Sequence, residues 1–401
     1  MALFFCPLCN QRESQLLHSL SLAPKSHLIG QNQTVSAQDF GSMQIVECIS
    51  CGHIYNSAFN PDEAESMYVL SHMTNAPVSQ GMVNAVKKTA DLIMSSCPKA
   101  ERVLEIGGGS GALALAIASS GIEVVMVEPN RHSDVSLLAD KGVELVSDMF
   151  PSDKVTGKFD LIVCRQVMEH VPDPSIFMDS IEKSLAAGGS IYLEVPNADF
   201  ILKNRSIVDF HFPHIQYFRQ QVLTEWLEKR GHAISSVISI KDNHDIGFFL
   251  SHRQGVPKIE VPPKEGSAPT GLDTSSFAID LVALRAQAAE LLRQSPKPIA
   301  LYGATAYSQA FFGAWPNCVV ERMFDDTEAY WSSSVYGPKG SIRVMRCDKD
   351  AIKGVGTVVI CAYLHDKEIM KRLRQEGFEG TVYTLRSAAS NPVEAGIQSL
   401  A

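Results

Sequence analysis

The sequence lacks the features that would place the chain in or across a membrane. None of its apolar runs approaches the roughly 20 residues that a membrane-spanning helix needs. The first six residues lack the basic segment and the long apolar core of a signal peptide. The net charge of −9 argues against a nucleic-acid backbone as the main partner. We therefore expect a cytoplasmic protein whose partners include neither membranes nor nucleic acids.

Disulfides are also not expected, although the chain has nine cysteines. Without a secretory signal these should stay reduced, so clustered cysteines indicate a metal site. Two C-x-x-C pairs occur, Cys6 with Cys9 and Cys48 with Cys51. Two such pairs complete a tetrahedral zinc site and leave no open coordination position, which predicts structural zinc. Unrelated buried cysteines are the alternative.

A glycine-rich turn follows the first strongly apolar strand of the main domain. Residues 102–106 read as that strand, Gly107 to Gly111 as the turn, and residues 112–118 as the following helix. Glycine is needed where a chain turns sharply and a ligand approaches its backbone closely. The pattern predicts a nucleotide-like cofactor, and by itself it fits NAD, FAD or S-adenosylmethionine (SAM).

An acidic residue, Glu128, ends the next predicted strand, 21 residues after Gly107. A carboxylate at this place accepts hydrogen bonds from a ribose diol. Further strands, alternating with helices, are predicted at 142–146, 159–164 and 190–195. This alternation predicts an α/β fold, with a Rossmann-like, mostly parallel sheet that binds its ligand at the carboxyl ends of the strands.

Several motifs then follow one another in order: E-I-G-G-G-S-G, the acidic strand end, S-D at 147–148, F-D-L-I-V-C-R-Q-V-M-E-H-V-P-D-P, and L-A-A-G-G-S-I-Y-L-E-V-P-N. Together they resemble the class I SAM-dependent methyltransferases over about residues 80–250. The resemblance implies that the ribose and amino-acid portion of SAM is contacted by Glu105, Gly107, Gly109 and Glu128. It implies that Asp148 and Met149 flank the adenine. It also implies that Cys164, Arg165 and Gln166 lie beside the methionine. Helix capping is the alternative for Asp148.

The acceptor side is predicted on the loop after the fifth strand, where His211 and His214 stand among aromatic residues. Imidazole titrates near neutral pH, so a histidine beside a SAM site is a candidate general base. We favour His214 as that base, whereas a structural role is the alternative for each histidine. The pair Glu169-His170 is expected at the mouth of the SAM pocket, more as a closing element than as a catalyst.

The loop also resembles a narrower family, the deoxysugar C-methyltransferases acting on nucleotide-linked keto sugars. That family implies a four-cysteine zinc domain, a SAM domain and a C-terminal Rossmann-like domain. Its acceptor loop reads approximately Y-H-E-H-x-x-Y-F, whereas this chain has His211 at the tyrosine position, Pro213 at the glutamate position and His214 at the second histidine. Where the family has a Gly-Gly-Ser signature, this chain has N-H-D-I-G-F from Asn243. Tyr68, ahead of the SAM domain, is a further candidate catalytic residue.

The predicted domains are a zinc domain at 1–75, a SAM-dependent methyltransferase domain at 76–252, a linker at 253–276 and a Rossmann-like acceptor-binding domain at 277–401. The last repeats the strand–glycine–helix pattern around Gly303, but too sparsely for a dinucleotide site. Tyr307 and His365 are candidates for facing the acceptor.

The predicted function is methyl transfer from SAM to a small-molecule acceptor, a sugar or nucleotide-linked sugar. Transfer to carbon through an enolate, with His214 as base, is the first hypothesis. Transfer to a hydroxyl oxygen is the second. An NAD-linked dehydrogenase and a non-catalytic zinc-dependent adaptor remain as alternatives.

Overall fold

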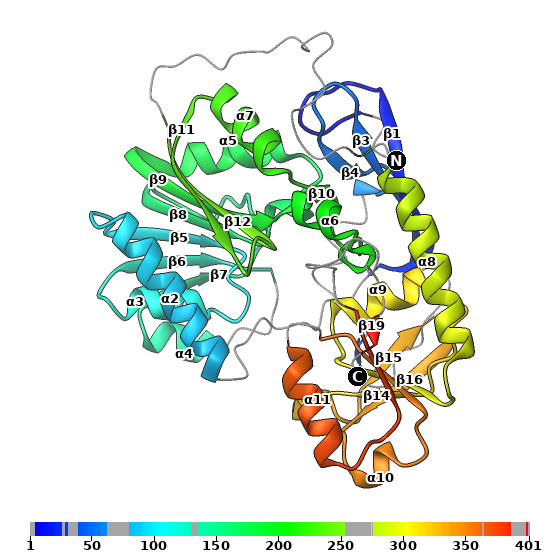
Figure 1. Ribbon diagram of the computed structural model, residues 1–401. Coiled ribbons are helices and arrows are strands. Elements are labelled where there is room, and N and C mark those ends of the chain that lie inside the picture. Colours follow the sequence, from blue (N-terminus) through cyan, green and yellow to red (C-terminus); the bar gives the residue numbers. More distant parts are fainter. Residues whose placement is uncertain are drawn as a thin grey trace.

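Figure 1 shows the computed structural model of the chain, which describes residues 5–25, 29–30, 39–61, 80–129, 135–252, 274, 276–337, 339–362, 365–385 and 398–399. Within these residues no helix has both the length and the apolar composition that crossing a membrane requires. Tyr68 and most of the predicted linker lie outside the described residues.

The central sheet has seven strands in the order β11-β12-β9-β8-β5-β6-β7. Five of them are parallel: β5 (Arg102–Ile106), β6 (Glu123–Val127), β7 (Val143–Val146), β8 (Phe159–Arg165) and β9 (Leu185–Pro196). The chain then adds an antiparallel pair at the edge, β11 (His232–Ile240) and β12 (Asp245–His252). The predicted mixed α/β, Rossmann-like sheet is confirmed, while β12 was not predicted.

Helices cover both faces of this sheet (Figure 1). On one face, α2 (Gln80–Ser96), α3 (Ala112–Ala118) and α4 (Val135–Asp140) share an apolar core with the strands. On the other face, α5 (Pro174–Ser184) and α7 (Gln220–Lys229) do the same. The strands are therefore apolar on both sides, as expected of a parallel sheet between two helical layers.

A smaller antiparallel sheet holds the N-terminal cysteines. Its strands are β1 (Ser14–Pro24), β3 (Phe40–Cys48) and β4 (Ile54–Asn56). The fourth strand, β10 (Gln216–Tyr217), comes from the predicted acceptor loop. The loop between α6 (Ala198–Asn204) and α7 is thus built into the N-terminal sheet as well as into the central domain.

The C-terminal region forms a second α/β unit with an eight-stranded sheet, β19-β18-β17-β13-β14-β16-β15-β2. Its parallel centre consists of β18 (Thr381–Thr384), β17 (Thr357–Ile360), β13 (Ile299–Tyr302), β14 (Arg322–Phe324) and β16 (Gly340–Met345). Its antiparallel edges are β19 (Gln398–Ser399), β15 (Ser334–Gly337) and β2 (Ile29–Gly30), the last from the N-terminal region. The helices of this unit are α8 (Phe277–Gln294), α9 (Ala306–Ala314), α10 (Lys349–Ile352) and α11 (Asp366–Gln375).

One apolar core joins the N-terminal sheet, the acceptor loop and the C-terminal unit. Its fully buried members include Leu20, Ile45, Phe210, Leu281 and Phe311. In Figure 1, α8 runs from the N-terminal sheet to the C-terminal unit. The acceptor loop is therefore held from two sides, which fixes where its histidines lie.

Candidate functional site

The glycine loop after β5 has the conformation and the close packing that only glycine tolerates. Gly107, Gly109 and Gly111 have φ of 73°, 57° and 79°, in the left-handed region that side chains avoid. A Cβ on Gly107 would lie 2.3 Å from Cγ2 of Val167. The loop thus packs directly against the segment that follows β8.

Glu105, at the end of β5, carries a buried carboxyl group with unused hydrogen-bonding capacity. Its side chain is 5% exposed, and its Oε2 has no hydrogen-bond partner among the described residues. Burial raises the pKa of Glu105 to about 7, although the guanidinium of Arg165 acts in the opposite direction. A buried oxygen without a partner is costly, and it marks a place where a donor on a ligand would be favourable.

Glu128, at the end of β6, accepts a hydrogen bond from the backbone N–H of Gly109 at 2.8 Å. It is 7% exposed. Its carboxylate therefore lies against the glycine loop, where the ribose of a nucleotide-like ligand was predicted.

Asp148 lies after β7 and is not a helix cap. Its carboxylate accepts hydrogen bonds from the Met149 N–H at 2.9 Å and from the Ser152 hydroxyl at 2.8 Å, and it pairs with Lys154 at 2.9 Å. The bond to Lys154 is the main cause of the lowered pKa of Asp148. The capping alternative was wrong.

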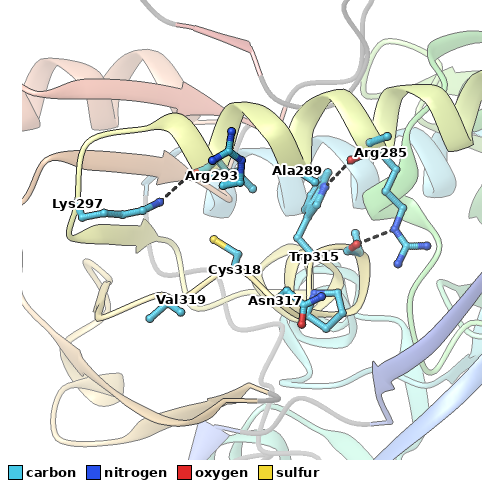
Figure 2. A pocket seen from close by; sticks show the side chains of 12 residues that line it. Arg285, Ala289, Arg293, Lys297, Trp315, Asn317, Cys318 and Val319 are labelled. Atoms are coloured by element: carbon cyan, nitrogen blue, oxygen red, sulfur yellow. Dashed lines mark hydrogen bonds between the residues drawn. The ribbon is translucent and has the colours of Figure 1, made fainter.

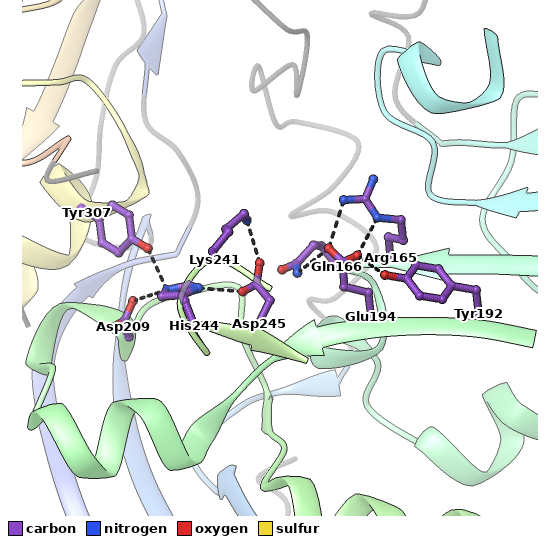
Figure 3. A network of polar contacts seen from close by, with 9 residues as sticks. All are labelled: Arg165, Gln166, Tyr192, Glu194, Asp209, Lys241, His244, Asp245 and Tyr307. Atoms are coloured by element: carbon purple, nitrogen blue, oxygen red, sulfur yellow. Dashed lines mark hydrogen bonds and ion pairs between the residues drawn. The ribbon is translucent and has the colours of Figure 1, made fainter. Parts of the chain in front are cut away.

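Arg165 and Gln166, at the end of β8, converge on Glu194 of the neighbouring strand β9 (Figure 3). The Arg165 guanidinium donates to both oxygens of Glu194, at 2.9 and 3.0 Å, and the Tyr192 hydroxyl donates at 2.8 Å. The Gln166 amide is 3.5 Å from the same carboxylate. Glu194 thus orients the side chains predicted beside the methionine of SAM. Cys164, by contrast, is fully buried in the sheet.

The acceptor histidines lie beside a short 3-10 turn, Met168–His170, that follows β8. The ring centroids of His170 and His214 are 4.8 Å apart, and those of His211 and His214 are 4.2 Å apart. A backbone hydrogen bond of 2.8 Å from the Ile215 N–H to the Glu169 carbonyl joins the two segments. The structure therefore brings His211 and His214 together with His170, next to the glycine loop.

Glu169 is the most deeply buried acid of this cluster, at 1% exposure. Neither of its carboxyl oxygens has a hydrogen-bond partner among the described residues, and Oε1 lies 3.6 Å from Nε2 of His170. Burial raises the pKa of Glu169 well above its ordinary value, which favours the protonated carboxyl group. Burial also lowers the pKa of His211, which favours the neutral imidazole.

A second polar group is built around His244 and includes a side chain of the C-terminal unit (Figure 3). His244 lies between Asp245, 2.6 Å from its Nδ1, and Asp209, 3.4 Å from its Nε2. The hydroxyl of Tyr307, at the start of α9, is 3.3 Å from the same Nε2. Tyr307 therefore does face the acceptor loop, whereas His365 lies on the surface, 3.2 Å from Glu368.

The four cysteines predicted as zinc ligands meet at one point. The sulfur atoms of Cys6, Cys9, Cys48 and Cys51 all lie within 4.8 Å of one another. Cys6 and Cys51 are 3.6 Å apart, and Cys9 and Cys48 are 3.5 Å apart. A tetrahedral zinc ion with Zn–S bonds of about 2.3 Å separates its sulfur ligands by about 3.8 Å. The donor set and its spacing fit structural zinc.

This cysteine cluster is connected to the acceptor loop through β4 and β10. The Cys48 N–H donates to the His53 carbonyl at 2.8 Å, just before β4 begins. His53 Nε2 lies 2.8 Å from Oε1 of Gln216 in β10, and the Asn56 N–H donates to the Ile215 carbonyl at 2.8 Å. Only one residue separates His214 from β10, so the cysteine cluster supports its position.

A separate cavity of about 580 Å³ lies beside α8 in the C-terminal unit (Figure 2). Arg285 and Lys297, which line it, donate to the carbonyls of Ala314 and Leu292, at 2.7 and 2.6 Å. These cations thus stabilise the surrounding backbone. The cavity lies at the C-terminal end of α9, whereas Tyr307 lies at its start.

Comparison with known families agrees with this geometry, because residues 82–237 match a family model described as a methyltransferase domain. The chain carries a class I SAM-dependent methyltransferase domain. The match begins in α2 and ends in β11, so it includes the glycine loop and the acceptor histidines.

Two curated relatives differ in the atom that their names give as the methyl acceptor and in how much of this chain they match. The C-methyltransferase NovU of Streptomyces niveus is 23% identical over 333 residues, which are 77% of each chain. A ubiquinone biosynthesis O-methyltransferase of Xanthomonas oryzae pv. oryzae is 30% identical over 105 residues, 24% of this chain and 43% of that enzyme. The chain thus spans less than half the length of the second relative.

Among solved structures, a SAM-dependent methyltransferase from Clostridium acetobutylicum aligns with a TM-score of 0.36 and 13% identity, over 42% of this chain and 92% of that one.

Three side chains of the site were not predicted as site residues: Glu194, Asp209 and His244. Glu169 was expected at the mouth of the SAM pocket as part of the E-H pair, and Glu194 was visible as the single acid in an apolar strand. His244 and Asp209 gave no such signal, because they meet only through the pairing of β12 with β9.

Proposed function

We propose that the chain transfers the methyl group of SAM to a carbon atom next to a carbonyl in a small-molecule acceptor, with a nucleotide-linked sugar as the acceptor class. NovU, which matches 77% of this chain, is named a C-methyltransferase, and this supports transfer to carbon. Methyl transfer to a hydroxyl oxygen is the second candidate, and the name of the Xanthomonas relative supports it.

The residues at the ends of β5 and β6 fit a SAM molecule. Glu105 offers a buried oxygen without a described partner, and the glycine loop has no room for further side chains. We propose that Glu105 and the loop glycines hold the amino-acid and ribose portion, Glu128 the ribose hydroxyls, Asp148 and Met149 the adenine, and Arg165 and Gln166 the methionine. When bound, SAM supplies an electrophilic methyl group, whose bond to sulfur breaks as the bond to the acceptor carbon forms.

In the acceptor site, His214 removes the proton next to the carbonyl and leaves an enolate, with the negative charge on the carbonyl oxygen. His211, whose lowered pKa keeps it neutral, lies against His214 and helps to position the acceptor. The observation that carries the proposal is the backbone bond from Ile215 to Glu169, because it holds the His214 loop beside the segment that packs on Gly107.

Hydrogen exchange tests this role of His214 without requiring methyl transfer. A nucleotide-linked keto sugar is incubated in D₂O with the protein and S-adenosylhomocysteine, and deuterium uptake next to the carbonyl is followed by NMR. We expect uptake with the native protein and a loss of about 100-fold or more with His214→Asn. His365→Asn, which removes an exposed imidazole of the C-terminal unit, is the matched control. Equal uptake with and without His214 would refute the assignment.

Ligand-induced stabilisation separates the remaining alternatives. A ligand raises the unfolding temperature of the fold that binds it. SAM is expected to do so and NAD is not; stabilisation by NAD alone would favour a dehydrogenase. Stabilisation by neither ligand would favour the zinc-dependent adaptor.

For the cysteine cluster we propose one structural zinc ion bound by Cys6, Cys9, Cys48 and Cys51. All nine cysteines are free of disulfides in the structure. We also propose a cytoplasmic location, because cysteine pairs at metal-ligand spacing are typical of a reducing compartment.

A further inference from the structure

A polar contact links the C-terminal unit to the methyltransferase domain beside the acceptor histidines. Tyr307 begins the first turn of α9, and its hydroxyl reaches Nε2 of His244 at 3.3 Å. His244 lies between β11 and β12 of the methyltransferase domain. Two residues that are 63 positions apart in the sequence thus meet across two domains, and both Tyr307 and His244 are ionisable.

The groups around His244 balance its positive charge. Asp245 and Asp209 approach its two ring nitrogens at 2.6 and 3.4 Å, and both are buried. Lys241 pairs with the other oxygen of Asp245 at 2.7 Å. The carboxylates of Asp209 and Asp245 carry two negative charges, and Lys241 supplies one positive charge. The second positive charge is present only when His244 is protonated. Although burial alone would lower the pKa of His244, its hydrogen bonds to Asp209 and Asp245 raise it to about 10.

The protonation of His244 sets the direction of its hydrogen bond with the Tyr307 hydroxyl. Both ring nitrogens of an imidazolium are donors, so the single Nε2–H is shared between the Asp209 carboxylate at 3.4 Å and the Tyr307 oxygen at 3.3 Å. Withdrawal of electron density from that oxygen makes the Tyr307 hydroxyl a stronger donor, since hydrogen bonds in a chain polarise one another. The same cation disfavours protonation of His211.

Tyr307 lies beside the acceptor histidines. Its ring is edge-on to His211, with centroids 6.2 Å apart, and His211 is in turn 4.2 Å from His214. The imidazole of His214 and the phenol of Tyr307 therefore both lie next to the ring of His211.

We propose that Tyr307 is a catalytic residue of the acceptor site, donating a hydrogen bond to the acceptor oxygen on which negative charge develops, and that His244 is its positioning residue. The inference rests on the proposed function, since it needs a step that creates an oxyanion. When His214 takes the proton from carbon, the electron pair of the C–H bond moves into the enolate and charge accumulates on the carbonyl oxygen. The Tyr307 hydroxyl stabilises that oxygen and keeps its own proton.

The test is Tyr307→Phe in the full-length protein, which removes the hydroxyl and leaves the ion pairs of His244 in place. Loss of one donor to a developing oxyanion lowers turnover by about 100-fold to 1,000-fold. We expect the deuterium uptake described above to fall by this amount, with SAM affinity unchanged. Tyr330→Phe, which removes another phenolic hydroxyl from the same domain, is the control and should retain uptake. Native uptake by Tyr307→Phe would overturn the inference.

Fluorinated tyrosine at position 307 distinguishes hydrogen-bond donation from packing. A fluorine lowers the phenol pKa with little change in shape, so the high-pH limb of the uptake profile should move to lower pH. An unmoved limb would contradict donation by Tyr307. His244→Gln should lower uptake less than Tyr307→Phe does, because the phenol remains.

The failure of this inference differs from the failure of the proposed function. If the native protein shows no His214-dependent uptake, the proposed function is wrong. If uptake depends on His214 but not on the Tyr307 hydroxyl, only the present inference is wrong.

Discussion

Replacing Glu105 by glutamine is expected to have opposite effects on folding stability and on SAM binding. The carboxyl group is 5% exposed, one of its oxygens has no described partner, and its pKa is raised from 4.5 to about 7. The folded state therefore holds the proton more tightly than the unfolded state does. Ionising the carboxylate in the folded protein costs about 1.4 kcal/mol for each unit of this shift.

The sign of the effect follows from this shift. Below pH 4.5 the carboxyl group is protonated in both states, so it imposes no penalty. As the pH rises from 4.5 to about 7, the native protein loses stability, and the loss reaches about 3 kcal/mol above pH 7. Glutamine does not ionise, so Glu105→Gln should be more stable than the native chain at pH 8.5, by up to that amount, and similar to it at pH 4.5.

SAM affinity should fall in the same variant, because a hydrogen bond to a charged group contributes about 1.5–3 kcal/mol, or roughly 10-fold to 150-fold. Urea denaturation at pH 4.5 and 8.5 measures the first effect, and calorimetric titration with SAM measures the second. A variant that is less stable than the native chain at pH 8.5, or that binds SAM as tightly, would refute the assignment of Glu105.

Three further perturbations follow from the packing. Gly107→Ala should weaken SAM binding and lose more stability than Gly121→Ala, since both have positive φ but only Gly107 has a neighbour in the way; equal losses in a urea titration would contradict this. Arg219→Met removes a 3% exposed guanidinium that pairs with two carboxylates at 3.0 and 2.9 Å, and should lower the free energy of unfolding by about 3–5 kcal/mol, whereas Arg293→Met, in an exposed pair, should change it little. Zinc removal by a chelator should reduce deuterium uptake before it reduces SAM affinity, because the cysteine cluster supports the His214 loop. A loss of SAM affinity before any loss of deuterium uptake would contradict this supporting role.

The methyltransferase domain was largely predictable because its determinants are local. The strands, the glycine turn and Glu128 lie within a short stretch of chain. Apolar runs mark the strands and glycines mark the turn, and both can be read directly from the sequence. Even so, β12 was missed. It is an antiparallel strand inserted between β9 and β11. It pairs with the preceding strand β11 and, at the register Asp245 to Pro196, with β9, 49 residues earlier.

The assembly of the three regions was less predictable, since it depends on pairings between distant segments. Gln216–Tyr217 is added to the N-terminal sheet, and Ile29–Gly30 to the C-terminal sheet. Each of these strands has only two residues, which is too short to show the alternating pattern of a strand in the sequence. His244 was also not recognised as a site residue. Its carboxylate partner Asp209 and its phenol partner Tyr307 are brought to it only by the folded chain.

The central claim is that SAM donates its methyl group to carbon. The measurement that tests it most directly uses SAM labelled with ¹³C in the methyl group, a nucleotide-linked keto sugar and ¹³C NMR of the product. The account predicts a product resonance of a methyl group bound to carbon, lost in His214→Asn. A methyl resonance of an O–CH₃ group, or transfer that persists in His214→Asn, would contradict it.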